Sequence, residues 1–446
     1  MSPSAETAAA GSSATATVDA RSVDATTAPP PAPRGTTLSD ISVALAYAGW
    51  ALASLFFFYS FATRVSPSIM VDALMRDFGL GAAILGNLSA IYFYVYGALQ
   101  IPIGIALDRF GPRRLLGGGA LIAALGCAVF ALADAAWLAY LGRFLIGAGV
   151  ASGWLGTLAV IVQNFPARRF ALLAGGTQAF GMAGATMGQV PLSLVVETQG
   201  WRAAMGSLAL FGVLLALALI LVLRDRIVPQ ARAIAIGAAV RHAIRSRQTW
   251  LCAIFSMAMI APMLGFAGLW GVPYLMQVHA LSRTEAAGLA SAMFIAWGVA
   301  SPLVGAISDR IGSRRRVMIA GAALATLLLA SLPFMAAAPL WLLAALILGI
   351  GTFGSSYVAG LSLARESNPD AISGTVLGLV NTCVIATGAI LQPAIGWILD
   401  LHWDGAMAAG ARIYPPDAFA WGLAVLPVVA ALGALAAFFA KDARAD

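Results

Sequence analysis

The sequence predicts an all-α membrane protein with twelve transmembrane helices in two six-helix bundles. Of its 446 residues, 61% are hydrophobic and only 10% are charged, and the mean hydropathy is +0.88. A soluble domain carries about 25% charged residues, so a water-soluble fold could not bury this much apolar surface. Apolar runs of roughly 18 to 25 residues without alternation satisfy their backbone polar groups in lipid only as helices. A transmembrane barrel would instead show alternating segments of about ten residues.

The net charge of +7 and the three cysteines bear on two other classes, nucleic-acid-binding proteins and disulfide- or metal-stabilised folds. Basic residues collect in the cytoplasmic loops of membrane proteins, so we expect the lipid bilayer as a partner and no nucleic acid. Cys127, Cys252 and Cys383 lie far apart, each inside an apolar run. We interpret them as buried thiols and expect no disulfide framework, no bound metal and no cofactor.

Twelve apolar runs give the expected spans, and a segment of different composition precedes them. Residues 1–40 are dominated by Ala, Ser, Thr and Pro without the apolar core of a signal peptide, which predicts a disordered cytoplasmic tail. The spans are expected at about 41–73, 84–106, 114–133, 137–161, 170–195, 203–223, 250–274, 286–307, 317–336, 339–362, 373–398 and 417–440.

The widest gap between the runs carries six arginines and divides the spans six and six. We therefore predict an N-terminal bundle at 41–223, a cytoplasmic central loop at 224–249, a C-terminal bundle at 250–440 and a cytoplasmic C-terminus at 441–446.

The distribution of basic residues predicts the orientation. With the N-terminal tail in the cytoplasm, 20 of the 26 Lys and Arg residues fall on the cytoplasmic side. By the positive-inside rule, both termini of this multi-pass inner-membrane protein are cytoplasmic. Among the remaining six, Arg64 and Arg143 are expected inside the membrane.

The two halves repeat one charged motif at an offset of 201 residues. After the second span the chain reads Gly104-Ile-Ala-Leu-Asp108-Arg109-Phe-Gly111-Pro-Arg113-Arg114. After the eighth span it reads Gly305-Ala-Ile-Ser-Asp309-Arg310-Ile-Gly312-Ser-Arg314-Arg315. A repeat at half the length of the membrane region implies a duplicated pair of bundles. The glycines permit close helix packing, and the aspartates can lie at the N-terminus of a neighbouring helix.

This repeated motif resembles the signature loop of the major facilitator superfamily, and the resemblance covers about residues 41–440. It implies a transporter, not an enzyme, in which these loops latch the outward-facing state by pairing across the two halves. The gating residues expected from the resemblance are Gly104, Asp108, Arg109, Gly111, Arg113, Arg114, Gly305, Asp309, Arg310, Gly312, Arg314 and Arg315.

Two further stretches resemble members of this family. In the fourth span, Arg143-Phe-Leu-Ile-Gly147-Ala-Gly149 is similar to its R-x-x-x-G-x-G element, which implies that Arg143 lies within or near the cavity. The first two spans resemble the anion:cation symporter branch, in which an arginine late in the first helix holds a substrate carboxylate. Arg64 occupies the matching place.

The physical chemistry of these spans agrees with an anion site. An arginine at membrane depth is a functional hypothesis by default, and its planar fork suits a carboxylate, sulfonate or phosphate. Tyr92 and Tyr96 are four residues apart on one helical face, which Gln100 continues. The residues expected to bind the substrate are Arg64, Tyr92, Tyr96, Gln100, Arg143, Trp270, Tyr274, Asn381 and Gln392.

Two positions depart from the symporter branch. Thr63 and Val150 stand where the branch has acidic residues that carry protons, and none of the 19 Asp and Glu residues falls convincingly at the middle of a span. The sequence therefore does not support proton coupling through a membrane carboxylate. Facilitated uniport, and coupling through the charge of the substrate, stay open.

We predict a monomeric secondary transporter that takes up a small organic anion by alternating access. A dipeptide uniporter is the first alternative, because it would need no membrane carboxylate. Met259 and Met263 share a helical face and thioethers suit Cu(I), so a copper importer is another, as is a siderophore importer. A membrane sensor without transport is the alternative from a different class. No enzyme is expected, because no nucleophile–base pair or metal-ligand cluster occurs at one depth.

Overall fold

The computed structural model describes residues 43–225, 236–369 and 372–442. The expected tail at 1–40, part of the central loop and the last four residues lie outside the described residues. Helices make up nearly all of the described chain, with one two-residue-per-strand hairpin, β1 (Met407–Ala408) and β2 (Ala411–Arg412). The predicted all-α membrane fold is confirmed.

The N-terminal half contains seven described helices and two short 3-10 turns. The helices are α1 (Val43–Val65), α2 (Val71–Phe78), α3 (Ala82–Ala131), α4 (Ala136–Val150), α5 (Gly153–Asn164), α6 (Phe170–Met187) and α7 (Val190–Val222). The 3-10 turns are η2 (Ser66–Ile69) and η3 (Ala167–Arg169).

The C-terminal half begins in the segment that the sequence predicts as a loop. The described part of that loop holds a short helix, because apolar Val240, Ala243 and Ile244 alternate with basic residues so that one face is apolar. The elements of this half are α8 (Ile236–Arg245), α9 (Arg247–Ala261), η4 (Pro262–Trp270), α10 (Gly271–His279), α11 (Arg283–Ile311), α12 (Arg314–Ser331), η5 (Leu332–Met335), α13 (Leu340–Gly354), α14 (Tyr357–Glu366), α15 (Ser373–Leu401), α16 (Pro416–Leu423) and α17 (Val425–Phe439).

Twelve spans follow from the helix lengths. Eleven segments of the described chain are long and apolar enough to cross a membrane, and one of them, Leu172–Val222, has 51 residues. A continuous helix of that length would extend about 76 Å, more than twice the hydrocarbon thickness. Gly200 interrupts it with φ 86° and ψ 166°, so the segment is two spans. Gly111, with φ 76°, separates the second and third spans within α3 in the same way.

The segment η4 in the seventh span is a π-helix of nine residues. Such wide turns are uncommon and are frequent at functional sites. All nine residues of η4 are buried, and the segment lies between α9 and α10 where the two halves meet.

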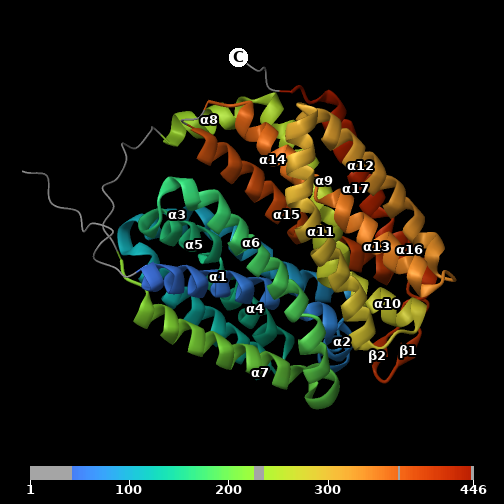
Figure 1. Cartoon of the computed structure of the whole chain (residues 1–446). Helices are drawn as coiled ribbons and strands as arrows, with labels where there is room; N and C mark the ends of the chain where they lie inside the picture. Colours follow the sequence, from blue (N-terminus) through green and yellow to red (C-terminus); the bar gives the residue numbers. More distant parts are fainter. Residues whose placement is uncertain (1–42, 226–235, 370–371, 443–446) are drawn as a thin grey trace, which may run out of the picture. The chain divides into compact units, whose positions relative to one another are not determined.

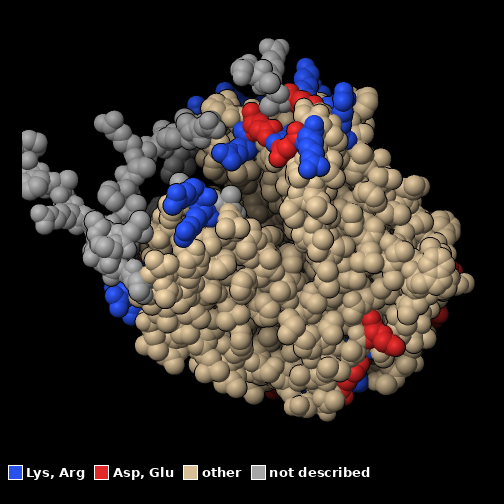
Figure 2. Space-filling view, in the orientation of Figure 1, with Lys and Arg blue, Asp and Glu red and all other residues tan. Residues whose placement is uncertain are grey.

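The two halves lie side by side, with α3 against α15 and α6 against α11 (Figure 1). We call the end that carries α2, α10 and the hairpin the closed end, and the end that carries α8 and the two charged motifs the open end. Every hydrogen bond between the halves in the described residues lies between the closed end and the middle of the helices. At the open end the surface is hollowed between the halves, and charged side chains stand around the hollow (Figure 2).

Close helix packing depends on the glycines of the fourth span, as the sequence predicts. A Cβ atom on Gly149 of α4 would meet the backbone of Gly119 and Ala123 in α3, and one on Gly147 would lie 2.8 Å from the carbonyl oxygen of Tyr92. Neither neighbour is a flexible side chain, so the helices would have to separate.

Substitution of Gly149 with valine should lower the free energy of unfolding by about 1–3 kcal/mol, because overpacking displaces α3 from α4. Gly118→Val is the matched control, since a Cβ at Gly118 of α3 meets nothing within 4 Å. The midpoint of thermal unfolding in detergent measures both variants. Equal midpoints would show that α3 and α4 do not approach as closely as described.

Candidate substrate site

The candidate site begins where α1 ends. Arg64 lies in the last turn of α1, only 7% exposed, directly before η2 with Pro67 in its first turn. Its Nε donates a hydrogen bond of 3.3 Å to Tyr92 Oη, and Tyr92 Oη donates to the carbonyl oxygen of Ser60. A residue of α3 therefore positions the guanidinium group of this α1 residue.

The surroundings of Arg64 are aromatic. Its Cζ lies 4.2 Å from the ring centroid of Phe61 and 5.4–5.9 Å from the centroids of Tyr92, Phe93 and Tyr96. Tyr92 and Tyr96 stack with centroids 6.0 Å apart and an interplanar angle of 12°. Ring faces attract the cation without neutralising it.

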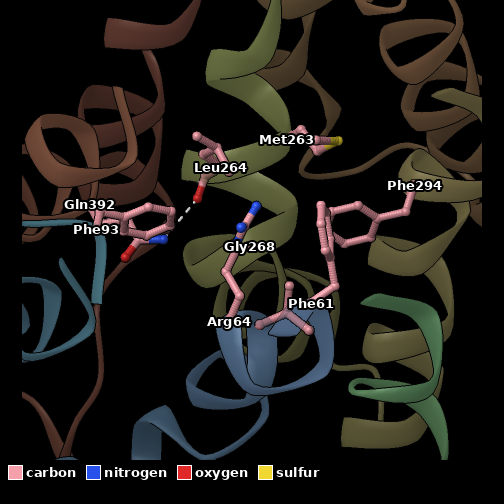
Figure 3. Close-up of a pocket in the computed structure, with 9 residues that line it drawn as sticks. Phe61, Arg64, Phe93, Met263, Leu264, Gly268, Phe294 and Gln392 are labelled. Atoms are coloured by element: carbon pink, nitrogen blue, oxygen red, sulfur yellow. Dashed lines mark hydrogen bonds between the residues drawn. The ribbon is translucent and has the colours of Figure 1, made fainter. Parts of the chain in front are cut away.

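Arg64 has no acidic partner in the described part of the chain. None of the ion pairs found there includes it, and Nη1 and Nη2 have no hydrogen-bond acceptor. The guanidinium points toward η4, which belongs to the other half (Figure 3). The terminal nitrogens are thus free to bind an anion.

A pocket lies at this junction of the halves (Figure 3). It is lined by Phe61, Arg64, Val65, Phe93, Met263, Leu264, Gly268, Phe294 and Gln392. One cation and one amide are its only polar side chains, and neither a carboxylate nor a histidine is among these nine residues. Such a site suits a small anion with an apolar or weakly polar body.

Arg143 lies behind Tyr92, outside the pocket wall. It is 1% exposed, and its Nη1 and Nη2 donate to the carbonyl oxygens of Thr63 and Ser89 at 2.8 and 3.1 Å. Helix ends leave carbonyl groups free, and Arg143 binds one of those left free where α1 ends. The structure gives it the position of a brace between α1, α3 and α4, and its part in substrate binding stays a prediction.

The other predicted site residues lie at different depths. Gln100 donates to the carbonyl oxygens of Tyr96 and Ala151, and Trp270 donates to the carbonyl oxygen of Gln392. Tyr274 donates to the carbonyl oxygen of Leu332. Asn381 is half-buried on α15, eleven residues and therefore about 16 Å from Gln392. Of the nine residues, the pocket brings together Arg64 and Gln392, with Tyr92 and Tyr96 beside the arginine.

The apolar residues of the pocket wall could not be predicted from the sequence. Phe61, Phe93 and Phe294 carry no signal that separates them from core phenylalanines. Met263 was considered only for copper, and its partner Met259 packs near Gly354 and Gly433, away from the pocket lining.

Comparison with known proteins bears on this geometry. The family model of the Major Facilitator Superfamily matches residues 51–393 and 251–446. The chain belongs to this superfamily. Its curated relatives have the names of transporters, and its long apolar helices make this chain a multi-pass membrane protein.

Four curated relatives have names that indicate organic anions: sulfoacetate, galactarate or D-glucarate, L-galactonate and tartrate. The chain is 27% identical to a probable L-galactonate transporter of Escherichia coli over 284 residues, 58% of this chain and 62% of that protein. It is 25% identical to a probable sulfoacetate transporter of Cupriavidus necator over 150 residues, 34% and 35% of the two chains. This chain therefore spans less than two thirds of the length of these two relatives, 62% of one and 35% of the other.

Solved structures show the same fold. A bacterial homologue of the human lysosomal transporter Spinster, inward-facing and unoccupied, aligns with a TM-score of 0.74 at 18% identity, covering 89% of this chain and 98% of that one.

The closed end of this facilitator is held by charged and polar contacts between the halves. Arg283 of α11 forms a bidentate ion pair with Asp72 of α2, at 2.8 and 2.9 Å. Burial of Asp72 would by itself raise its carboxyl pKa, but the hydrogen bonds and charge of Arg283 outweigh burial and hold the pKa below its ordinary value. This stabilisation is present above the ordinary pKa of about 3.9 and is lost as the pH falls through the lowered value.

The uncharged side chains of Gln189 and Ser291, and a helix cap by Asp400, also join the halves at the closed end. Gln189 is fully buried, donates to Ser68 and to the carbonyl oxygen of Ala267 in η4, and accepts from Ser291 of α11. Asp400, at the end of α15, accepts hydrogen bonds from the backbone nitrogens of Ala82 and Ala83 at 3.0 and 2.9 Å. The C-terminal half therefore caps the first turn of α3 in the N-terminal half.

At the open end, the motif residues bond within their own halves. The backbone nitrogen of Arg113 donates to Asp225 and its Nε to the carbonyl oxygen of Ile220, both at 2.8 Å. Arg315 repeats both contacts in the second half, with Asp442 and the carbonyl oxygen of Phe438. The sequence repeat instead aligns Arg113 with Arg314, so the contacts are shifted by one residue.

The remaining motif contacts are local as well. Arg314 pairs with Asp309 and with Glu366 of α14. Gly111 and Gly312 both have positive φ, 76° and 66°, which explains why glycine stands at this motif position in each half. Among the side chains that the structure describes, no motif residue pairs across the halves, and the predicted gating role stays a prediction.

Replacement of Asp72 with asparagine should favour opening of the closed end, because Arg283 loses its counter-charge. We expect a change of about 1 kcal/mol in the equilibrium between the closed and opened ends, or about five-fold in their populations. Distances between spin labels at Leu132 and Phe334, which are 80% and 82% exposed in opposite halves, would measure opening in a background without native cysteines.

Asp77→Asn is the matched control for this experiment. Asp77 lies on the same short helix but pairs with Arg76 and Arg202 inside the N-terminal half. The control should leave the distance distribution unchanged. A closed end that responds equally to both variants would contradict a latch made by Asp72 and Arg283.

Proposed function

We propose that this chain takes up a small organic anion across the inner membrane by alternating access, with both termini in the cytoplasm. The observation that carries the proposal is Arg64, a buried cation that lines the pocket with free terminal nitrogens and has no carboxylate partner in the described residues. The open end, where most motif arginines lie, is then the cytoplasmic side. On this proposal the carrier is open to the cytoplasm and works as a monomer.

The energetics of a buried cation support this assignment. An unpaired charge in a membrane interior is costly, and aromatic faces and one tyrosine offset only part of that cost. A bound carboxylate or sulfonate would complete the neutralisation and could accept two parallel hydrogen bonds from Nη1 and Nη2. L-galactonate and sulfoacetate, which occur in the names of the relatives, both carry such groups.

The alternatives fit the pocket less well. A dipeptide could place its carboxylate on Arg64, but no acidic side chain of the lining would receive its ammonium group. A copper importer would need soft ligands that converge, whereas only Met263 of the candidate pair reaches the pocket. A sensor without transport would not need a pocket at the meeting point of two halves with one closed end.

Replacement of Arg64 with glutamine should weaken anion binding by about 100-fold, which corresponds to about 3 kcal/mol for two charge-assisted hydrogen bonds. The fold should survive, because no ion pair is lost, and the melting temperature should stay equal or rise. Isothermal titration of purified protein with a panel of carboxylates and sulfonates measures binding.

Arg168→Gln, at an exposed arginine outside the pocket, should bind as the unchanged protein does. Anion binding that survives in Arg64→Gln would place the site elsewhere. Failure of every carboxylate and sulfonate in the panel to bind would remove the organic-anion proposal.

Binding should also be nearly independent of pH. No group that titrates between pH 5.5 and 8 lines the pocket, and strong-acid substrates keep their charge over this range. We expect the dissociation constant of the best anion to vary by less than about three-fold. A steep, ten-fold change per pH unit would instead reveal a coupled proton site that the pocket lining does not contain.

A further inference from the structure

The amide of Gln392 faces Arg64 across the pocket from the other half. Gln392 lies on α15 next to Pro393, is 1% exposed, and lines the pocket (Figure 3). Its Nε2 donates to the carbonyl oxygen of Leu264 in η4 at 3.0 Å, and its own carbonyl oxygen accepts from Trp270 Nε1 at 2.9 Å. The residue is therefore fixed at both its backbone and its side chain.

The second atom of this amide is unsatisfied. Oε1 of Gln392 is buried and has no hydrogen-bond partner among the described residues. The orientation of the amide follows from its neighbour, because the carbonyl oxygen of Leu264 requires a donor and a flipped amide would place two oxygen atoms against each other. Buried acceptors are normally paired, so an unpaired acceptor in a pocket wall indicates a missing donor.

The pocket has no donor of its own for this atom. Apart from Arg64 and Gln392, the side chains that line the pocket are hydrocarbon, thioether or absent. Gly268 leaves space beside the amide, since a Cβ there would lie 3.7 Å from Gln392 Nε2. A solute that fills the pocket meets two fixed requirements, an anionic group for Arg64 and a hydrogen-bond donor for Gln392.

We propose that Gln392 determines specificity by accepting a hydrogen bond from a hydroxyl group of the transported anion. The proposal rests on the anion function assigned to Arg64. An ammonium group would also donate, but it would lie near the Arg64 cation without an acidic side chain in the lining, so a neutral hydroxyl fits better. The carrier then prefers hydroxylated organic anions to the same anions without the hydroxyl. Three relatives are named for hydroxylated anions, galactarate or D-glucarate, L-galactonate and tartrate, whereas sulfoacetate, in the name of a fourth, has no hydroxyl group.

Two pairs of anions that differ only in hydroxyl groups test the proposal: tartrate with succinate, and lactate with propionate. Isothermal titration of the purified full chain should show the hydroxylated member of at least one pair bound about ten-fold more tightly, the worth of one buried hydrogen bond. In Gln392→Met, which keeps the length of the side chain but has no acceptor oxygen, this preference should fall to within about two-fold. The affinity for the hydroxylated member should fall more than the affinity for the unhydroxylated member, a difference that a general loss of the pocket would not produce.

The control variant is Thr382→Val on the same helix, where the hydroxyl is exposed and bonds only to the carbonyl oxygen of Gly378. It should keep the preference. Equal binding of both members by the unchanged protein would overturn the proposal without any variant, as would a preference that persists in Gln392→Met. Failure of the anion function gives a different result. Each anion would then bind to Arg64→Gln as tightly as it binds to the unchanged protein, and the proposed role of Gln392 would be contradicted as well.

Discussion

A guanidinium that is buried at membrane depth and lacks an acidic partner in the described chain is the interaction on which the site depends. Arg64 is positioned by Tyr92 and by the aromatic faces around it, while Arg143 bonds to the carbonyl oxygen of Thr63, where α1 ends. Both arginines lie in lipid-embedded helices, yet only Arg64 has terminal guanidinium nitrogens without a partner among the described residues. Both terminal nitrogens of Arg143 donate to backbone carbonyl oxygens, so this arginine joins α1, α3 and α4.

The arrangement of the two halves follows from the position of that charge. Inter-half bonds extend from the closed end inward as far as the contact of Tyr94 with the carbonyl oxygen of Ala389, and the pocket lies at this depth. Beyond it, toward the charged motifs, the described residues bond only within their own half. A solute can therefore approach the cation from one side only, which is the geometric condition for alternating access.

Hydropathy and the repeat were sufficient to predict the class and the twelve spans, because each span must satisfy its own backbone in lipid. Arg64 and Gln392 could be found in the sequence because polar residues inside apolar runs are rare. Their depths could not be found, since helix kinks such as η4 and the tilt of each span decide which residues share a level. Asn381 and Tyr274 do not line the pocket, and their predicted part in substrate binding stays a prediction. The pairing of Asp225 and Asp442 with the motifs could not be found either, because each acid lies more than a hundred residues from its partner.

The π-helix η4 has a mechanical consequence. Gln392 of the pocket holds the carbonyl oxygen of Leu264, and Gln189 of the closed end holds that of Ala267. The two carbonyls are three residues apart, less than one turn of this wide helix. The side-chain amides of Gln392 and Gln189 therefore donate hydrogen bonds to the same helical turn. A π-turn can return to α-helical bonding by a shift of one residue, and that shift would rotate both carbonyls together. The amide that lines the pocket and the amide at the closed end are thereby connected through one turn of backbone, without a relay of side chains.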